Sequence, residues 1–426
     1  MKIEPFSLPD QLTLGCATAS AQIEGGDKNH SWYAWSIVED HIKDESTTLR
    51  ACRHWDKTSR DLLLMKSLGI SEYRFSIEWS RIEPREGVFD PDALRHYHDE
   101  IEQMRALGIR PLVTLHHFSN PLWFEEKGAF LSDDAPEIFL RYAAFVVSSL
   151  QDLVDEYVTI NEPNVYAVNG YVFGMWPPGR RKVSEYFHAI SNLAASHILT
   201  YQMIHDRYSD RAVRVGFANH LRIFTGAGIN PANHLAAKVM EYCFQDIVTD
   251  VMAFGRRLPP LPRNKAIRRG RYFDFIGINY YSRSAISRFA DGVLPGRPTS
   301  DLGWEIYPEG LGILLRRQYK RYRAPVYITE NGTCDAKDHF RPLFICDHLK
   351  QIAESNVPVE RYYHWTLTDN FEWAEGESAP FGLFAYDFDK DEVSERNSAR
   401  LYRDIITNHG LTEDMIDRYL TNSSSP

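Results

Sequence analysis

The sequence predicts a single (β/α)8 barrel, and two observations lead to this fold class. Eight short apolar runs with strand composition alternate with eight longer runs of helical periodicity. No linker or shift in composition divides the 426 residues, a length that one barrel with enlarged loops can fill. We therefore expect one domain over residues 1–426, with a frayed tail from about residue 421.

The predicted strands are short and rich in β-branched and aromatic residues, the composition of strands buried on both faces. Most are followed directly by polar residues or by turn-forming Gly, Pro and Asn, which end the extended segment. They lie at residues 13–17, 72–76, 110–115, 157–160, 213–218, 273–279, 326–329 and 361–365.

The predicted helices carry apolar residues at every third or fourth position. Two of them end at glycines of the kind that cap helices, Gly69 and Gly108. Two proline-rich segments, 259–262 and 294–298, are predicted to be loops within the domain. The helices lie at residues 61–69, 93–107, 136–150, 185–208, 234–254, 309–322, 344–354 and 394–407.

Charge and cysteine content exclude several classes of function. The net charge of −10 argues against a nucleic-acid or membrane-surface partner, and the basic run at 268–271 is short enough to be a solvated face. The five cysteines are scattered without a CxxC pair, so no disulfide framework, zinc site or other metal site is expected. They are expected to be small buried side chains, with Cys334 the candidate for exposure.

The N-terminus has no basic-then-apolar signal, and no apolar run is long enough to span a membrane. We therefore expect a cytoplasmic protein.

Two glutamates stand at the ends of predicted strands, where barrel enzymes keep their chemistry. Glu330 follows a run of β-forming residues and precedes an Asn-Gly turn. Glu162 follows a similar run, and Pro163 blocks continuation of the strand. Our hypothesis is that folding brings these two distant residues together as the carboxylate pair of a retaining glycosidase.

Other strand ends carry polar and aromatic side chains as well. Sugars offer hydroxyl groups for hydrogen bonds and C–H faces for stacking, so such a mixture is typical of a sugar site. The residues concerned are Gln22, Glu24, Arg74, His116, His117, Asn161, Asn279, Tyr280, Tyr281, Trp365, Asp369, Glu372 and Trp373.

Taken in order, these segments resemble glycoside hydrolase family 1, the β-glucosidase family. The resemblance extends over nearly the whole chain, and it is specific because many ordered motifs carry it together. The matching segments are 15–25, 73–82, 114–121, 159–163, 170–179, 277–281, 303–311, 329–332 and 365–376.

The resemblance implies catalytic roles for five residues. Glu330 matches the nucleophile and Glu162 the general acid/base, which in a retaining enzyme lie about 5–5.5 Å apart. Arg74 matches an arginine whose charge would keep Glu330 ionised. Tyr281 matches a tyrosine that hydrogen-bonds the nucleophile, and Asn279 an asparagine near the acid/base.

The resemblance also implies substrate-binding residues. Asn161 would contact the 2-hydroxyl, Gln22 and Glu372 the 4-hydroxyl, and Glu372 also the 6-hydroxyl. Trp365 would be the stacking floor of the sugar and Trp304 would line the aglycone side. His117, Trp373 and Phe381 complete the expected set.

Alternatives stay open for single residues. Arg74 fits a structural ion pair, and Trp365 and Trp304 fit core packing. His116 fits a structural role better than a ligand role. Pro380, where many members carry arginine, and the acids Glu375 and Glu377 depart from the family pattern beside the 6-hydroxyl, which affects fine specificity.

The expected activity is hydrolysis of non-phosphorylated β-D-glycosides, small molecules, without a cofactor. Glu372 and Trp373 stand where members acting on 6-phosphorylated sugars differ, and Glu162 favours O-glycosides over thioglycosides. Glucosides are the expected substrates, with fucosides and galactosides as side activities. Transglycosylation on the same scaffold, and a non-catalytic sugar-binding barrel, are the alternatives.

Overall fold

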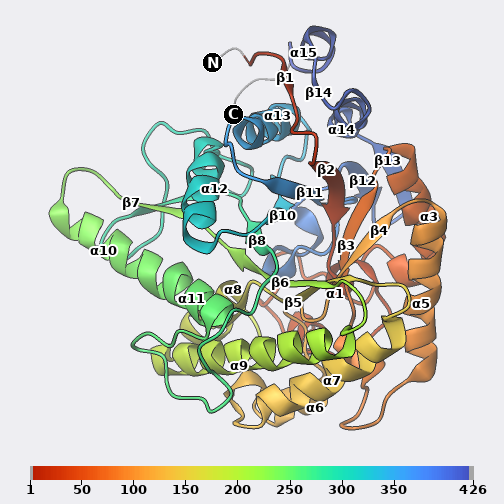
Figure 1. Cartoon of the computed structure of the whole chain (residues 1–426). Coiled ribbons are helices and arrows are strands. Elements are labelled where there is room, and N and C mark those ends of the chain that lie inside the picture. The colour runs from red at the N-terminus through yellow and green to blue at the C-terminus, as the bar shows by residue number, and fades with distance from the viewer. Residues whose placement is uncertain (1–2, 422–426) are drawn as a thin grey trace.

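The computed structural model describes residues 3–421 and contains a closed barrel of eight parallel strands surrounded by helices (Figure 1). This confirms the predicted (β/α)8 fold. Around the barrel the strands follow the order β10, β11, β2, β3, β4, β5, β6, β8. Their bounds are β2 (Thr13–Ala17), β3 (Glu72–Ser76), β4 (Arg110–Thr114), β5 (Glu156–Asn161), β6 (Arg214–His220), β8 (Ile276–Asn279), β10 (Val326–Asn331) and β11 (Val359–Trp365).

Long helices cover the outside of the barrel, close to where the periodicity predicted them. Helix α5 shows how the sequence starts one: Asp90 accepts hydrogen bonds from the backbone N–H groups of Asp92 and Ala93, and Pro91 stands at the first helical position. The helices are α3 (His54–Ser67), α5 (Pro91–Ala106), α7 (Ala135–Leu150), α9 (Val183–Arg207), α10 (Pro231–Glu241), α11 (Ile247–Phe254), α12 (Glu309–Tyr322), α13 (Arg341–Ala353) and α14 (Asn397–Asn408).

One predicted helix, 234–254, is interrupted. A π-helical turn, η3 (Tyr242–Asp246), separates α10 from α11. A π turn adds a residue to the helical repeat without breaking the apolar pattern, so periodicity alone could not reveal it.

Short elements that the sequence analysis did not predict occupy the loops. Within residues 3–421, three pairs of strands lie outside the barrel: β1 (Phe6–Ser7) with β14 (Gly410–Leu411), β7 (Ile223–Gly226) with β9 (Arg283–Ile286), and β12 (Phe384–Asp387) with β13 (Glu392–Glu395). The short helices are α1 (Ser20–Ile23), α2 (Ser31–Ser36), α4 (Trp79–Ile82), α6 (Leu122–Glu126), η1 (Ala129–Leu131), α8 (Pro163–Val168), η2 (Asn169–Phe173), η4 (Trp373–Ser378) and α15 (Glu413–Tyr419). Of the predicted frayed tail, residues 422–426 lie outside the described residues.

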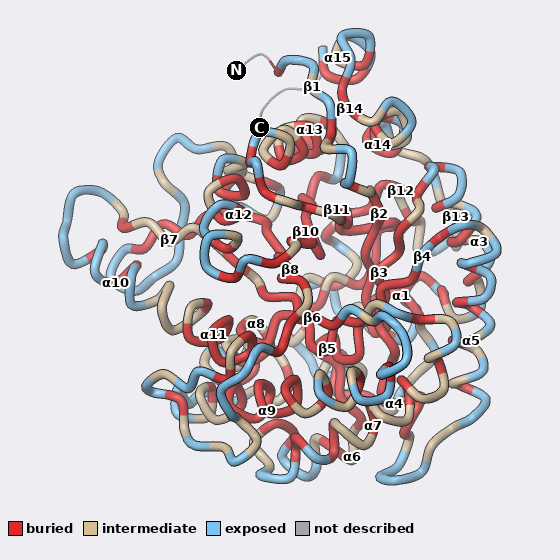
Figure 2. Tube along the Cα trace, viewed as in Figure 1, coloured by how far each residue is buried: buried red, intermediate tan, exposed pale blue. Residues whose placement is uncertain are grey.

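The barrel strands are buried almost throughout, as the continuous red of the central tubes in Figure 2 makes visible. Leu112, Val158, Ile278 and Ile328, each from a different strand, have no exposed surface. Close packing on both sides holds these strands in place, so the residues at their ends have well-defined positions.

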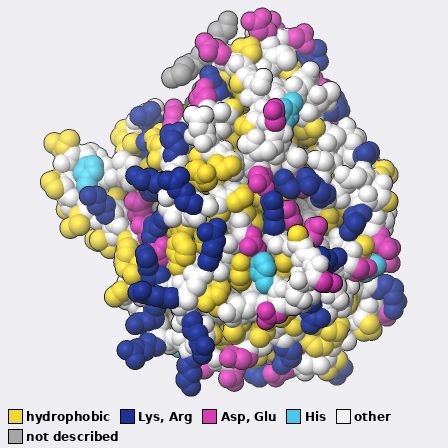
Figure 3. All heavy atoms as spheres, viewed as in Figure 1, with side chains coloured by type: hydrophobic (Ala, Val, Ile, Leu, Met, Phe, Trp, Pro, Cys, Tyr) yellow, Lys and Arg dark blue, Asp and Glu magenta, His cyan; other side chains and the backbone are white. Residues whose placement is uncertain are grey.

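The surface agrees with the expectation of a solvated basic face. Arg268, Arg269 and Arg271 are exposed, and Figure 3 shows Lys and Arg side chains gathered on the side of the molecule that carries α11 and α12.

No helix within residues 3–421 is long and apolar enough to cross a membrane. Cys334, the candidate for exposure, is instead buried, and burial raises its pKa to about 12, so it is not a reactive surface thiol.

The strand pair β2–β3 depends on a glycine. Gly15 lies opposite Glu72, and a Cβ at Gly15 would stand 2.2 Å from the Glu72 carbonyl oxygen. Gly15→Ala should therefore lower the free energy of unfolding by about 1–3 kcal/mol, measured by urea denaturation, because backbone must move to admit the methyl group. The control is Gly292→Ala, whose Cβ would meet nothing closer than 3.6 Å. Equal midpoints for the two variants would contradict the close approach.

Candidate active site

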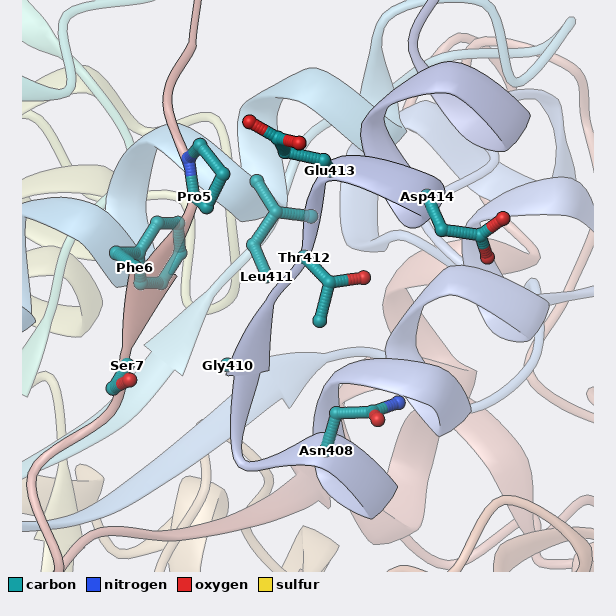
Figure 4. Close-up of a pocket in the computed structure, with 9 residues that line it drawn as sticks. All are labelled: Pro5, Phe6, Ser7, Asn408, Gly410, Leu411, Thr412, Glu413 and Asp414. Atoms are coloured by element: carbon teal, nitrogen blue, oxygen red, sulfur yellow. The ribbon is translucent and has the colours of Figure 1, made fainter.

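The predicted site residues gather at the carboxyl ends of the barrel strands. A separate surface hollow, drawn in Figure 4, is lined by Phe6 of β1, Leu411 of β14 and Asp414 of α15, among others. That hollow adjoins the segment leading into β2, whereas the two glutamates lie where β5 and β10 end. It therefore takes no part in the site described below.

Glu330 is held by two hydrogen bonds at the end of β10. Arg74 Nη1 donates to Glu330 Oε1 at 2.6 Å, and the Tyr281 hydroxyl donates to Glu330 Oε2 at 2.8 Å. The pairing of β10 with β8 is irregular at this point, between Ile328 and Glu330. Such irregularities redirect side chains beside active sites, and here the carboxylate meets a cation and a phenol.

Glu162 caps the start of helix α8 directly after β5. Its φ of 41° lies in the left-handed region, which is strained for a residue with a side chain. Asn279 Nδ2 donates to Glu162 Oε1 at 2.8 Å, and His220 Nδ1 lies 3.1 Å from the same oxygen. The strained backbone is held because Pro163 starts the next helix and the side chain is fixed from two sides.

A chain of hydrogen bonds connects the two carboxylates. Arg74 Nη2 donates to Asn161 Oδ1 at 2.7 Å, and Asn279 Nδ2 donates to the same oxygen at 3.0 Å. Thr329 in turn donates to Asn279 Oδ1 at 2.6 Å. The side chains that carry Glu330 and Glu162 are thereby members of one buried network, so a change at one carboxylate reaches the other.

Opposing effects act on the pKa of Glu330. Burial raises its pKa to about 7, helped by the nearby charge of Glu162, while the Arg74 charge and the Tyr281 hydrogen bond lower it. Arg74 thus favours the ionised form of Glu330, and desolvation opposes it with the larger effect. The role expected for Arg74 remains a prediction.

Glu372 lies with Gln22 and Trp365 as the resemblance implied. Gln22 Nε2 donates to Glu372 Oε2 at 3.2 Å, and Trp365 Nε1 donates to the same oxygen at 3.4 Å. Burial raises the pKa of Glu372 to about 8, against these hydrogen bonds. Burial thus favours the neutral carboxyl form of Glu372, which can both donate and accept a hydrogen bond.

His117 stands between two of the expected tryptophans. Its ring is nearly parallel to those of Trp365 and Trp373, with centroids 5.9 Å away in each case. Asn161 Nδ2 donates to His117 Nε2 at 2.9 Å, and burial together with Arg74 lowers the His117 pKa, so the ring is neutral. Its neighbour His116 hydrogen-bonds Asn120 at 2.9 Å, which suits the structural role expected for it.

Trp304 and Phe381 form the remaining edge of the cluster. Trp304 is half-buried, its ring 6.0 Å from Phe381 and edge-on to Tyr281 at 5.7 Å. Phe381 also lies edge-on to Tyr281, at 6.3 Å. Each residue to which the resemblance gave a catalytic or substrate-binding role thus belongs to this cluster, while the roles themselves remain predictions. Of the other strand-end residues, Glu24 pairs with Arg81 and Asp369 with Arg396, outside the cluster.

The sequence analysis missed some residues of this network. His220, at the end of β6, contacts Glu162, and Thr329 anchors Asn279. The rule that strand ends carry the site would have found His220, because it follows the predicted strand 213–218 by two residues. That strand was the one for which no strand-end residue was named.

Comparisons with known proteins agree with this geometry. The model of the family described as glycosyl hydrolase family 1 matches residues 5–411. The β-glucosidase A of Thermotoga maritima is 29% identical over 97% of this chain and 100% of its own length. The β-galactosidase of Saccharolobus solfataricus is 29% identical over 96% of this chain and 97% of its own. The solved structure of a β-glycosidase from Pyrococcus horikoshii superposes with a TM-score of 0.89 at 32% identity, covering 98% of both chains.

The buried pair of Arg74 and Glu330 should govern stability at the strand ends. Arg74→Met should lower the free energy of unfolding by about 3–5 kcal/mol, because it leaves a buried carboxyl group without its cation. Adding Glu330→Gln to that variant should restore about 1–2 kcal/mol, since the uncompensated group is then neutral.

Urea denaturation of the single and double variants measures both effects. The matched control is Arg74→Met with Glu125→Gln, because Glu125 is hydrogen-bonded by Asn120 and not by Arg74 and should give no recovery. Equal recovery by the two double variants would contradict a specific coupling between Arg74 and Glu330.

Proposed function

The chain belongs to glycosyl hydrolase family 1 and is a β-glycosidase, and we propose that it hydrolyses non-phosphorylated β-D-glycosides with retention of anomeric configuration. Glucosides are the proposed main substrates, with fucosides and galactosides as side activities. The proposal rests on two buried glutamates that belong to one hydrogen-bond network but have chemically different partners. One is bound by a cation and a phenol, the other by an amide and an imidazole.

In the first step Glu330 attacks the anomeric carbon and Glu162 donates a proton to the leaving oxygen. The bond between that carbon and the leaving oxygen breaks, and its electron pair goes to the oxygen. Ionised Glu330 suits attack because Arg74 and Tyr281 favour its charged form. The product of this step is a covalent glycosyl-enzyme with Glu162 ionised.

In the second step the ionised Glu162 takes a proton from water while the water oxygen bonds to the anomeric carbon. The ester bond to Glu330 breaks, and the carboxylate returns to its contacts with Arg74 and Tyr281. Two inversions at one carbon give net retention, and both carboxyl groups return to their starting protonation.

Unpaired polar atoms support recognition of a sugar ring. Gln22 Oε1 and His117 Nδ1 are buried and have no hydrogen-bond partner among the described residues. Buried polar atoms normally find partners, and the hydroxyl groups of a sugar can donate to the first and accept from the second. Trp365 provides a flat aromatic face beside them, suited to the C–H side of the ring.

The environment of Glu372 supports a sugar without a 6-phosphate. Two cations pack on the loop that follows Glu372, and both are paired: Lys43 with Glu375, and Arg50 with Glu377. A phosphate dianion would find neither of these cations free.

A panel of nitrophenyl glycosides tests the proposal. We expect turnover of β-D-glucoside first, then fucoside and galactoside, and little turnover of a 6-phosphoglucoside. Proton NMR of the first sugar released should give the β anomer, and the α anomer would overturn retention. A dominant alkyl glycoside at low methanol concentration would favour transglycosylation, and no turnover would favour a non-catalytic sugar-binding barrel.

One domain over the whole chain and a cytoplasmic location stay predictions from the sequence.

Chemical rescue distinguishes the two glutamates. Glu330→Ala should show no measurable turnover, and azide should restore reaction with an activated β-glucoside to give the α-glucosyl azide. Glu162→Ala should lose about 10²–10⁴-fold in kcat/KM on alkyl glucosides but little in kcat/KM on dinitrophenyl glucoside, whose leaving group needs no proton in the first step. Anomeric assignment by NMR is the readout, and a β-glucosyl azide from Glu330→Ala would mean the roles are reversed.

The pH profile should report the hydrogen bond from Tyr281. This bond lowers the pKa of Glu330, so Tyr281→Phe raises it further above about 7. Glu330 must be ionised to attack, and activity is lost as pH falls through its pKa. The acidic limb of kcat/KM should therefore move up by about one pH unit.

The control for this shift is Tyr280→Phe, which removes a neighbouring buried hydroxyl that donates to the Tyr307 carbonyl. Its acidic limb should stay where the parent protein has it. A limb that moves in both variants, or in neither, would contradict the assigned hydrogen bond.

A further inference from the structure

His220 is the one side chain outside the predicted set that contacts a catalytic carboxyl group in the described network. It ends β6, and its Nδ1 lies 3.1 Å from Glu162 Oε1. The side chain is 12% exposed. A histidine at this distance either orients the carboxyl group or packs beside it, and its other contacts distinguish these roles.

Two aromatic rings and a backbone hydrogen bond fix the position of His220. Its ring lies parallel to Tyr281, with an angle of 13° and centroids 5.8 Å apart, and edge-on to Phe244 at 6.0 Å. Its carbonyl oxygen accepts a hydrogen bond of 2.8 Å from Asn164. The imidazole is therefore held with Nδ1 directed at Glu162, and little rotamer freedom is lost when the hydrogen bond forms.

Asn279 and His220 both contact the same oxygen of Glu162, Oε1. Asn279 Nδ2 can only donate, and it donates to Oε1 at 2.8 Å. No hydrogen bond from the described residues reaches Oε2. An oxygen that accepts from an amide N–H is a poor site for a proton, so the second oxygen is the one free to carry it.

We propose that His220 is a positioning residue. Together with Asn279 it hydrogen-bonds Oε1 of Glu162, which leaves Oε2 as the oxygen that transfers the proton. In this arrangement His220 carries hydrogen on Nδ1 and donates to Oε1. The inference rests on the proposed function, since it concerns which atom of the acid/base gives and takes the proton.

The proton then follows one path in both steps. In the first, the proton on Oε2 passes to the leaving oxygen as its bond to the anomeric carbon breaks and Glu330 bonds to that carbon. Glu162 becomes an anion, which the N–H groups of Asn279 and His220 stabilise at Oε1. In the second, Oε2 takes a proton from the attacking water while the Glu330 ester breaks.

Two substitutions separate orientation from packing. His220→Phe keeps a ring against Tyr281 but has no N–H, whereas His220→Asn keeps an amide N–H near the position of Nδ1 but has no ring. We expect His220→Phe to lose about tenfold in kcat/KM on an alkyl β-glucoside. It should change less than about twofold on dinitrophenyl β-glucoside, which needs no proton.

His220→Asn should stay within about threefold of the parent protein on both substrates, because it restores the donor. Two results would overturn the proposal: a His220→Phe variant equal to the parent on the alkyl glucoside, or equal losses on both substrates. Failure of the proposed function is distinguishable, since the parent protein itself would then turn over neither substrate.

Discussion

The buried guanidinium of Arg74 is the constraint on which the rest of the site depends. Taking a cation out of water is costly unless every N–H finds an acceptor and the charge finds a partner. Arg74 on β3 meets this need with Thr114 of β4, Asn161 of β5 and Glu330 of β10. The ends of four strands must therefore come to defined positions, which aligns the residues of the candidate site.

Glu330 and Glu162 are chemically identical side chains with different hydrogen-bond partners. Glu330 faces a permanent cation and a phenol, so a negative charge is well supported there, although burial opposes it. Glu162 faces an amide and an imidazole, which accommodate both a carboxyl group and a carboxylate. Because one hydrogen-bond network connects the two, neither environment can be altered independently of the other.

The sequence was informative about the barrel because strands buried on both faces form apolar runs that end abruptly at polar residues. Glu162 and Glu330 stand at such ends, and the ordered motifs supplied their neighbours. The π turn at Tyr242–Asp246 was missed because it leaves the apolar pattern of the helix intact. The strands β7 and β9 were missed because they pair with each other outside the barrel, and no local pattern records that pairing. The burial of Cys334 depends on tertiary packing, and the raised pKa of Glu330 on the desolvation that such packing causes. No local sequence pattern records either.

Closure of the barrel by β2 and β11 has a consequence for synthesis of the protein. Cys16 pairs with His364, and Gln22 hydrogen-bonds Glu372, across almost the whole length of the chain. While the ribosome is still making the later segments, the hydrogen-bonding edge of the first barrel strand has no β11 to pair with, and Gln22 has no Glu372 to contact. A nascent chain therefore stays inactive, with an open strand edge for chaperones to shield, until its final barrel strand has emerged.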